Sequence, residues 1–324
     1  MKKICIIGKG SIGVRHAKIF HKYGCEIFFY RTFKNLKSYK LDFFFTEINT
    51  LNDFKKNSFD LIVICNPTSL HFKTLNKLSE YTKNFFIEKP LVSNLKEVKA
   101  LEKLVIKKKL NLFSGYFLRY NKNILKLKSI ISNNIGKINN SNLLWHTYMP
   151  NWHPGENYKR SYTARKKLGG GVIQTCSHEI DLASYFFGPV KDVLCKKLKS
   201  NLNLEVESSV IIILNHVNGI ISQINLNYVS KNIDRFIEVY FDRFQIKLDL
   251  NKKYILKKIS EKKEKIIIKN YQKLVDAYEN QNRYILQNLN RDNSKLHLKD
   301  TIHTEKIIQY CKLSLKNNKL TKVI

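Results

Sequence analysis

The chain has 324 residues, of which 43% are hydrophobic and 12% aromatic. This is enough apolar material to bury cores for about two domains, and it excludes a mainly disordered protein. The most apolar run, residues 210–214, has the length of a strand, far short of the roughly 20 apolar residues of a membrane-spanning helix. The apolar run after Met1 is too short for a signal peptide, so we expect a soluble, cytoplasmic protein without a membrane partner.

The net charge is strongly positive, because 58 basic residues against 26 acidic ones give +32. Such a charge can indicate nucleic-acid binding. The basic residues are mostly lysines, however, and they are spread along a chain that is also rich in asparagine, isoleucine and phenylalanine, all of which have A/T-rich codons. We therefore attribute most of the charge to composition bias and a solvated surface, with an anion-attracting field as the alternative, and expect no nucleic-acid partner.

The six cysteines are scattered and form no C-x-x-C pair. A zinc site needs closely spaced thiolates, and a disulfide framework is typical of small secreted domains. We therefore expect neither a metal nor disulfides, and interpret the cysteines as small buried hydrophobic residues.

Short apolar runs alternate with amphipathic segments in the first part of the chain. The pattern predicts strands over residues 4–8, 26–30, 60–65, 84–87 and 111–116, and helices over 11–23, 70–80 and 95–108. Such alternation indicates the α/β class, with a Rossmann-type, doubly wound parallel sheet. We assign residues 1–118 to this domain.

The pattern changes after a predicted helix at residues 121–134. Long segments of alternating hydrophobicity predict strands over 137–148, 190–199, 206–216, 219–229, 234–241 and 243–250, with a glycine-led helix at 171–187 and closing helices at 270–289 and 301–316. Such alternation of apolar and polar residues is typical of a sheet with one solvated face. It predicts a second, α+β domain over residues 119–324, with a large open, mainly antiparallel sheet.

A glycine motif joins the first predicted strand to the first predicted helix. It reads Gly8-Lys9-Gly10-Ser11-Ile12-Gly13, a G-x-G-x-x-G. In this context the glycines permit a tight turn and close approach to a pyrophosphate, whose charge the helix N-terminus stabilises. The motif predicts a dinucleotide site that includes Gly8, Gly10, Ser11, Ile12 and Gly13.

The end of the second predicted strand indicates which dinucleotide binds. An acidic residue there accepts a hydrogen bond from the ribose of NAD, but this chain has Tyr30-Arg31-Thr32-Phe33-Lys34. Arg31 and Lys34 can hold a 2′-phosphate through charge-assisted hydrogen bonds, although Arg31 can also stack on adenine. We therefore expect NADP(H) to be favoured over NAD(H).

Further motifs follow in a characteristic order. They are residues 60–71, which include Asn66, Pro67 and His71; Glu88-Lys89-Pro90; residues 115–120, which end in Arg119 and Tyr120; and residues 169–181, which include Gln174, His178 and Asp181. Together with the glycine motif, they make the chain resemble the Gfo/Idh/MocA family of oxidoreductases, named for glucose–fructose oxidoreductase and inositol dehydrogenase. By motif the resemblance covers about residues 1–190, and the remainder agrees with the family in architecture.

The resemblance implies hydride transfer between a nicotinamide cofactor and a carbinol carbon of a sugar, cyclitol or sugar nucleotide. It implies that Asn66, Pro67, His71, Glu88 and Lys89 lie at the cofactor. It also implies a homodimer or homotetramer formed through the open sheet. Similar members often belong to bacterial surface-glycan pathways.

Lys89 and His178 are the candidate catalytic residues. Oxidation of an alcohol removes a proton while hydride leaves, so the site needs a base that titrates near neutral pH, as imidazole does. Like the lysine of the family's Glu-Lys-Pro motif, Lys89 is expected to hydrogen-bond the reacting hydroxyl, and Pro90 allows a cis bond at this turn. Asp181 is expected to orient His178 or to contact a substrate hydroxyl. The alternative is a buried helix in which His178 and Asp181 satisfy each other.

One position departs from the family. Many members have an aspartate four residues before the histidine, where this chain has Gln174. A glutamine can hydrogen-bond a sugar hydroxyl but cannot act as a base. The substitution places a proton-relay role for this position in doubt and makes a protein without redox activity conceivable.

Aromatic and basic side chains precede the glycine run and are candidates for substrate binding. They are Trp152, His153, Tyr158, Arg160 and Arg165, and the family pattern adds Arg119 and Tyr120. Such residues suit a sugar face and a phosphate or carboxylate. A solvated loop with one core tryptophan is the alternative.

The sequence is compatible with three functions. The leading one is an NADP(H)-dependent dehydrogenase or reductase of a sugar or sugar nucleotide. The second is an enzyme that oxidises its substrate transiently and keeps its cofactor bound. The third is a redox-silent, dinucleotide-binding sensor on the same fold.

Overall fold

The computed structural model describes residues 1–30, 41–134, 137–152, 157–252, 254–260, 263–269, 273–289, 291 and 294–323. They form two compact units, one of Met1–Tyr116 with Tyr278–Glu305 and the other of Phe117–Ala277 with Lys306–Ile324. The sequence division placed all of residues 119–324 in the second domain, whereas residues 278–305 pack in the first unit. The physical reason is helix α8 (Leu274–Asn288), whose Ile285 is buried in the core of that unit.

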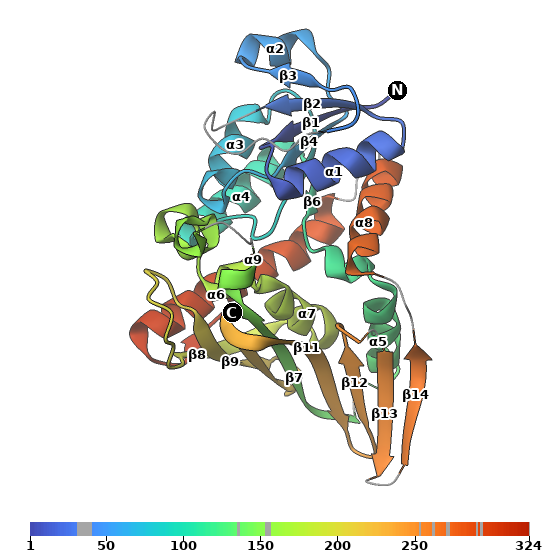
Figure 1. Ribbon diagram of the computed structural model, residues 1–324, viewed down its shortest axis with the longest axis vertical. Coiled ribbons are helices and arrows are strands. Elements are labelled where there is room, and N and C mark those ends of the chain that lie inside the picture. The colour runs from blue at the N-terminus through green and yellow to red at the C-terminus, as the bar shows by residue number, and fades with distance from the viewer. Residues whose placement is uncertain are drawn as a thin grey trace. The chain divides into compact units, whose positions relative to one another are not determined.

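The first unit contains a six-stranded sheet in the order β3-β2-β1-β4-β5-β6, with all neighbouring strands parallel (Figure 1). The strands are β1 (Lys3–Ile7), β2 (Glu26–Tyr30), β3 (Thr46–Ile48), β4 (Leu61–Ile64), β5 (Asn84–Ile87) and β6 (Asn111–Ser114). This is the order of a doubly wound dinucleotide-binding sheet and confirms the predicted fold class. The prediction missed β3 and helix α2 (Leu51–Lys56), because β3 has three residues of which only Ile48 is buried.

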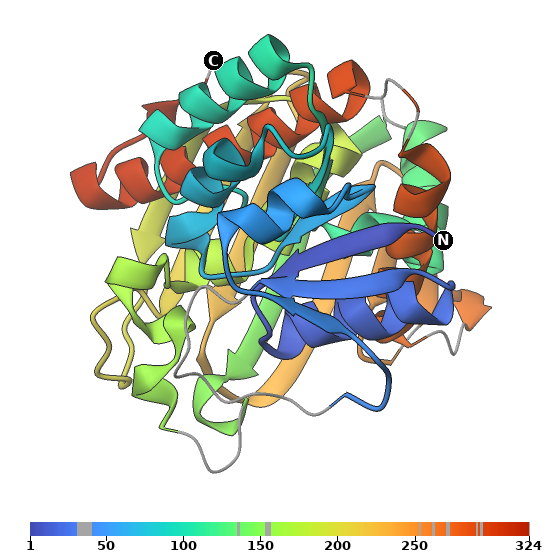
Figure 2. The same ribbon diagram turned by 90° about the horizontal axis from the view of Figure 1, so that it is seen from above.

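Helices α1 (Ser11–Lys22), α3 (His71–Leu78) and α4 (Leu95–Lys108) follow β1, β4 and β5. They lie on both faces of the parallel sheet (Figure 2). Helix α1 buries Val14, Ala17 and Phe20, which recur at helical spacing. Ala17 and Phe20 join a cluster that includes Ile285, so α8 completes the core on this face.

The second unit contains a nine-stranded sheet in the order β14-β13-β12-β11-β7-β10-β9-β8-β15. Its strands are β7 (Ile138–Tyr148), β8 (Val190–Lys197), β9 (Ser209–His216), β10 (Ile221–Asn227), β11 (Val229–Phe241), β12 (Gln245–Asp249), β13 (Tyr254–Ser260), β14 (Lys263–Lys269) and β15 (Thr321–Lys322). Among the described strand pairs of this sheet, β7 and β10 alone are parallel, which confirms the predicted mainly antiparallel sheet. The prediction missed β13 and β14, which are rich in lysine, and β15, which has two residues.

Helices cover one face of this sheet. They include α5 (Lys122–Ser132), α6 (Val172–Thr175), α7 (Ser177–Phe187) and the end of α9 (Ser294–Asn317). Burial alternates along β9, where Val210, Ile212 and Leu214 are fully buried. The single helix predicted over residues 171–187 is divided at Cys176, whose φ of −94° and ψ of 28° are not helical.

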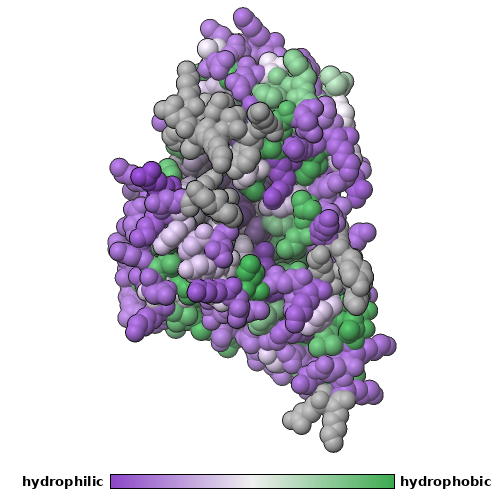
Figure 3. Space-filling view, viewed as in Figure 1, coloured by the Kyte–Doolittle hydropathy of each residue, from purple (hydrophilic) through white to green (hydrophobic). Residues whose placement is uncertain are grey.

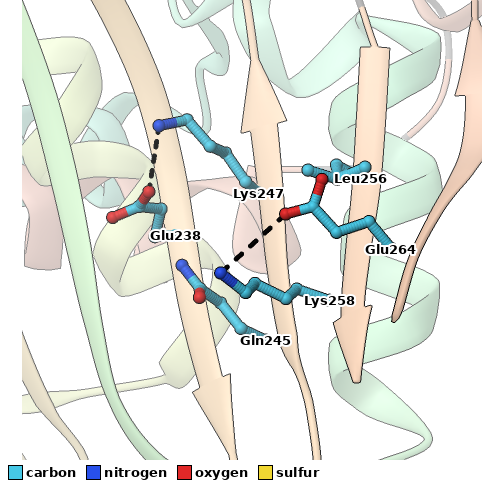
Figure 4. A pocket seen from close by; sticks show the side chains of 6 residues that line it. All are labelled: Glu238, Gln245, Lys247, Leu256, Lys258 and Glu264. Atoms are coloured by element: carbon cyan, nitrogen blue, oxygen red, sulfur yellow. Dashed lines mark ion pairs between the residues drawn. The ribbon is translucent and has the colours of Figure 1, made fainter. Parts of the chain in front are cut away.

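Strands β11 to β14 place polar side chains beside one another. Glu238 pairs with Lys247 at 3.0 Å, and Lys258 pairs with Glu264 at 3.9 Å. With Gln245 and Leu256, these four residues line a pocket on the surface of the sheet (Figure 4).

Hydrophilic side chains cover most of the face shown in Figure 3, and apolar residues gather there in smaller patches. None of the described helices is both long enough and apolar enough to span a membrane.

Candidate functional site

The glycine loop is built as the sequence predicts. Gly8 has a φ of 102°, a backbone conformation that favours glycine, and its N–H donates to the Tyr30 carbonyl at the end of β2. A Cβ at Gly13 would overlap the Gly8 carbonyl oxygen, so only glycine lets α1 approach this closely. A Cβ at Gly10, by contrast, would meet no atom within 4 Å, which leaves open space at the start of α1.

This open space fits a pyrophosphate. Gly10 and Ser11 are exposed, Ile12 is half-buried, and the first N–H groups of α1 have no acceptor within the helix. The neighbouring Lys9 does not reach freely into solvent. Its Nζ lies 3.2 Å from Glu47 Oε1 and 3.9 Å from the centre of the Phe45 ring.

Arg31 and Lys34, which are predicted to select the cofactor, lie outside the described residues, as does His153 of the predicted substrate loop.

The Glu88-Lys89-Pro90 turn directly follows β5. The Lys89–Pro90 bond is cis, and Lys89 is half-buried. The buried Glu88 carboxylate accepts the N–H of Lys89 at 3.1 Å through Oε2. A Cβ at Gly115, which follows β6, would lie 2.8 Å from the Lys89 backbone nitrogen. The backbone after β6 therefore packs closely against this turn.

Three buried side chains that the sequence did not assign surround the turn. The His16 ring of α1 lies between Glu88 Oε1, 2.9 Å from Nε2, and Asn282 Oδ1, 3.0 Å from Nδ1. Glu305 of α9 accepts the N–H of Leu91 at 3.0 Å and the hydroxyl of Tyr116 at 2.7 Å. They escaped the sequence analysis because His16 and Glu305 lie within helical patterns, and their partners are far along the chain.

His71, whose place at the cofactor stays a prediction, lies between two backbone carbonyl groups. Its ring is 1% exposed, with Nδ1 2.9 Å from the Pro90 carbonyl oxygen and Nε2 2.7 Å from that of Asn66. Burial lowers the pKa of His71 below its usual 6.5. Asn66 is also buried and donates to Thr74, and Pro67 precedes a short 3₁₀ helix (Thr68–Leu70).

His178 lies in the first turn of α7 in the second unit. It is 2% exposed, and its ring packs edge-on against Phe117 with centroids 4.7 Å apart. Asp181 is fully buried in a bidentate pair with Arg119, at 2.6 Å and 2.9 Å. Two predicted site residues, Asp181 and Arg119, therefore bind each other. Tyr120 follows Arg119 in the same 3₁₀ helix (Phe117–Tyr120) and is half-buried.

Gln174, one turn before His178, is 2% exposed. Its Oε1 accepts from Nζ of Lys312 on α9 at 3.2 Å. Because an ammonium can only donate, this contact fixes which end of the amide faces Lys312. No sequence pattern distinguishes Lys312 from the many other lysines of the chain.

Gly171 and Glu207 lie together at the start of α6. Gly171 has a φ of 111°, and a Cβ there would overlap the Glu207 carboxylate. Glu207 Oε1 accepts the N–H of Ile173 at 3.2 Å, and burial raises the pKa of this carboxyl.

The residues of the predicted substrate loop differ in how far they are exposed to solvent. Trp152 is held by its own unit, since its Nε1 donates to Thr147 at 2.7 Å and its ring packs on Tyr228. Tyr158 is half-buried, and Arg160 and Arg165 are exposed. Among the described residues, no group of three or more His, Cys, Asp and Glu side chains is placed to hold a metal.

Family models match both parts of the chain. Residues 2–116 match the oxidoreductase family with an NAD-binding Rossmann fold, and residues 124–247 match the GFO/IDH/MocA C-terminal domain. The chain belongs to the GFO/IDH/MocA family of oxidoreductases, as its motifs predicted.

The chain is similar to several named proteins. It is 30% identical over 129 residues to an uncharacterized oxidoreductase, YrbE, of Bacillus subtilis, and 28% identical over 130 residues to the myo-inositol 2-dehydrogenase of Thermotoga maritima. Each match covers 40% of this chain and 36% of the relative. The WlbA dehydrogenase of Bordetella pertussis, solved in complex with NADH and UDP-GlcNAcA, has a TM-score of 0.75 at 16% identity over 99% of this chain and 97% of that one, which is a likeness of fold.

Proposed function

We propose that this protein transfers hydride between a nicotinamide cofactor and a carbinol carbon of a sugar or sugar nucleotide. The observation that carries the proposal is the register of the parallel sheet, in which Ile7, Ile64 and Ile87 lie side by side at the ends of β1, β4 and β5. The glycine loop, Asn66 and the Lys89 turn follow these three residues. The carboxyl edge of such a sheet is where dinucleotides bind.

The roles of the residues follow from their chemistry. When bound, the nicotinamide supplies the position that hydride leaves or enters. Lys89 donates a hydrogen bond to the reacting hydroxyl and orients it. His178 takes the hydroxyl proton during oxidation and returns it during reduction. Asp181 acts indirectly, because its ion pair with Arg119 ties α7 to the 3₁₀ helix that precedes α5.

The substrate class is supported by the relatives. One is named for myo-inositol, and the WlbA structure contains a sugar nucleotide with a carboxylate. We extend the proposal to a role in bacterial surface-glycan biosynthesis in the cytoplasm, where nicotinamide cofactors are available. Tyr120, Trp152, His153, Tyr158, Arg165 and Gln174 are the proposed substrate contacts.

The proposed cofactor is NADP(H) in preference to NAD(H). Its support is the sequence Tyr30-Arg31-Thr32, which lacks the carboxylate that would bind the ribose of NAD. We expect NADPH to bind about tenfold more tightly than NADH, a difference of about 1.4 kcal/mol. Arg31→Ala should remove the difference in a fluorescence titration, and Lys55→Ala on α2 should leave it unchanged. Equal affinities in the unmodified protein would contradict the preference.

Turnover is tested with a panel of sugar nucleotides and cyclitols. Lys89→Ala and His178→Ala should each abolish NADPH-dependent turnover of the active compound while cofactor affinity remains within about threefold of the unmodified protein. Loss of cofactor binding in His178→Ala would instead indicate that the variant is misfolded, which circular dichroism would show.

The proposed assembly is a homodimer or homotetramer formed through the open face of the second sheet. The Glu238–Lys247 and Lys258–Glu264 pairs supply charges of both signs on this face, which suits self-association. Light scattering should give a molar mass that is a multiple of 38.2 kDa, and Lys247→Glu should reduce this molar mass.

A dinucleotide-binding sensor is the second candidate. Gln174 favours it, because a neutral amide bound to Lys312 cannot serve as a base. Binding of NADPH without turnover of any compound in the panel, together with tight, salt-sensitive but sequence-specific DNA binding, would support this function over the enzyme.

A further inference from the structure

One buried side chain joins two loops at the carboxyl edge of the parallel sheet. His71 is the first residue of α3, and its two ring nitrogens lie 2.9 Å and 2.7 Å from the carbonyl oxygens of Pro90 and Asn66. Pro90 belongs to the turn after β5, and Asn66 belongs to the loop after β4. A single imidazole therefore spans the ends of two adjacent strands.

The chemistry of this position requires a hydrogen-bond donor. Carbonyl oxygens only accept, and a buried carbonyl without a donor costs free energy. Neutral imidazole donates one N–H, and its protonated form donates two. An alanine at position 71 would leave both oxygens without the ring, whereas a glutamine carries an amide with two N–H donors.

The backbone N–H groups of the turn have acceptors other than His71. The N–H of Glu88 donates to the Ile64 carbonyl of β4, that of Lys89 to the Glu88 side chain, and that of Leu91 to Glu305. Pro90 has no N–H, and its carbonyl oxygen is the polar group of the turn that lies against the His71 ring, 2.9 Å from Nδ1. Among these contacts, His71 is the one that links the turn to the Asn66 loop.

We propose that His71 is a positioning residue that sets the place of the Lys89 turn relative to the Asn66 loop. Its effect on the turn is independent of the reaction. Its effect on catalysis rests on the proposed function of Lys89.

The test measures the turn directly in the protein without ligand. Backbone hydrogen exchange is followed by mass spectrometry in peptides that cover residues 86–92, and the acetylation rate of Lys89 is compared with that of the exposed Lys99 on α4. The variants are His71→Ala and His71→Gln. The matched control is His216→Ala, because His216 is 3% exposed and contacts Gly188 and Ser222 in the second unit.

We expect His71→Ala to raise exchange over residues 86–92 about two- to tenfold, the loss of roughly one buried hydrogen bond. The acetylation rate of Lys89 should change while that of Lys99 stays constant. His71→Gln should remain within about threefold of the unmodified protein, and His216→Ala should leave both readouts unchanged. If His71→Ala does not fold, the test rests on His71→Gln, whose exchange over residues 86–92 should stay within about threefold of that of the unmodified protein.

Unchanged exchange over residues 86–92 in His71→Ala would overturn the proposal. So would an equal rise across all peptides of the first unit, which indicates general loss of stability, or a His71→Gln variant as open as His71→Ala. Failure of the unmodified protein to bind NADPH or NADH would remove the proposed function while leaving this result to stand on its own.

Discussion

At the scale of single residues, three glycines of one motif have three different physical roles. Gly8 adopts a positive φ, Gly13 admits the close contact of α1 with the loop, and Gly10 faces open space. Only the last of these roles concerns a ligand. The motif alone cannot separate these roles, because they depend on the backbone φ of each glycine and on the atoms that a Cβ there would meet within 4 Å.

Exchanging Gly13 and Gly10 for alanine separates folding from binding. Gly13→Ala should lower the free energy of unfolding by about 1–3 kcal/mol, because its Cβ meets backbone that cannot move aside cheaply. Gly10→Ala should retain the melting temperature but weaken NADPH binding, because its Cβ occupies the space that a pyrophosphate needs. Thermal melts with and without NADPH check both. Equal loss of stability in the two variants would contradict this division.

His71 also gives the stability a pH dependence. Its folded pKa lies below the usual 6.5, first because burial disfavours the charged ring, so the unfolded chain binds more protons below that pH. The contribution is therefore fully present above about pH 6.5 and is lost as the pH falls toward the folded pKa. Urea unfolding at pH 7.5 and 5.5 should show a smaller fall in His71→Gln than in the unmodified protein. Identical falls would assign the pH dependence to other groups.

At the scale of elements, the start of α6 illustrates how a carboxylate supports a helix while titrating abnormally. Glu207 reaches the first turn of α6 from outside it, and the missing Cβ of Gly171 makes room for it. Burial is the main cause of its raised pKa. At pH values between the ordinary pKa of 4.5 and the raised pKa of the folded protein, the folded state binds more protons than the unfolded chain. The free energy of unfolding therefore falls as the pH rises through this range.

Glu207→Gln should relieve this effect. The amide oxygen can still accept the N–H of Ile173, but it carries no charge to desolvate. We expect the variant to gain stability relative to the unmodified protein between pH 4.5 and pH 8, by about 1.4 kcal/mol for each unit by which the pKa is raised. Denaturant unfolding at both pH values measures this. A difference between the two proteins that does not change with pH would argue against the burial of the charge.

At the scale of the whole molecule, the first unit depends on a segment from the far end of the chain. Ile285 of α8 is fully buried among side chains of β1, β2 and α1. His16 on α1 faces Asn282 on α8, and Lys22 pairs with Glu279 at 2.7 Å. The Rossmann sheet is thus completed by residues more than a hundred positions beyond its last strand.

Truncating Ile285 tests this dependence. Ile285→Ala should cost about 2–5 kcal/mol, because it leaves a cavity in the shared core. Ile106→Ala, on the exposed face of α4 in the same unit, is the matched control, since Ile106 is 65% exposed and should change stability by less than about 0.5 kcal/mol. Comparable losses in the two variants would show that α8 is not part of the core.

Features that rest on local periodicity could be predicted from the amino-acid sequence. The five longer strands of the parallel sheet, the glycine loop and the alternating strands of the second sheet are visible because each repeats its pattern over neighbouring residues. The sequence also indicated Lys89 and His178 through motifs that stay in order along the chain. Short or lysine-rich strands such as β3 and β14 were missed, because their partners and not their own composition stabilise them.

Contacts between residues that are distant in sequence could be established from the folded structure alone. It showed that Asp181 pairs with Arg119, that Lys312 binds Gln174, and that His71 spans two loops. It also returned residues 278–305 to the first unit. Hydrogen bonds and buried ion pairs of this kind depend on distances of a few ångströms between elements, and the spacing of residues along a chain carries no information about those distances.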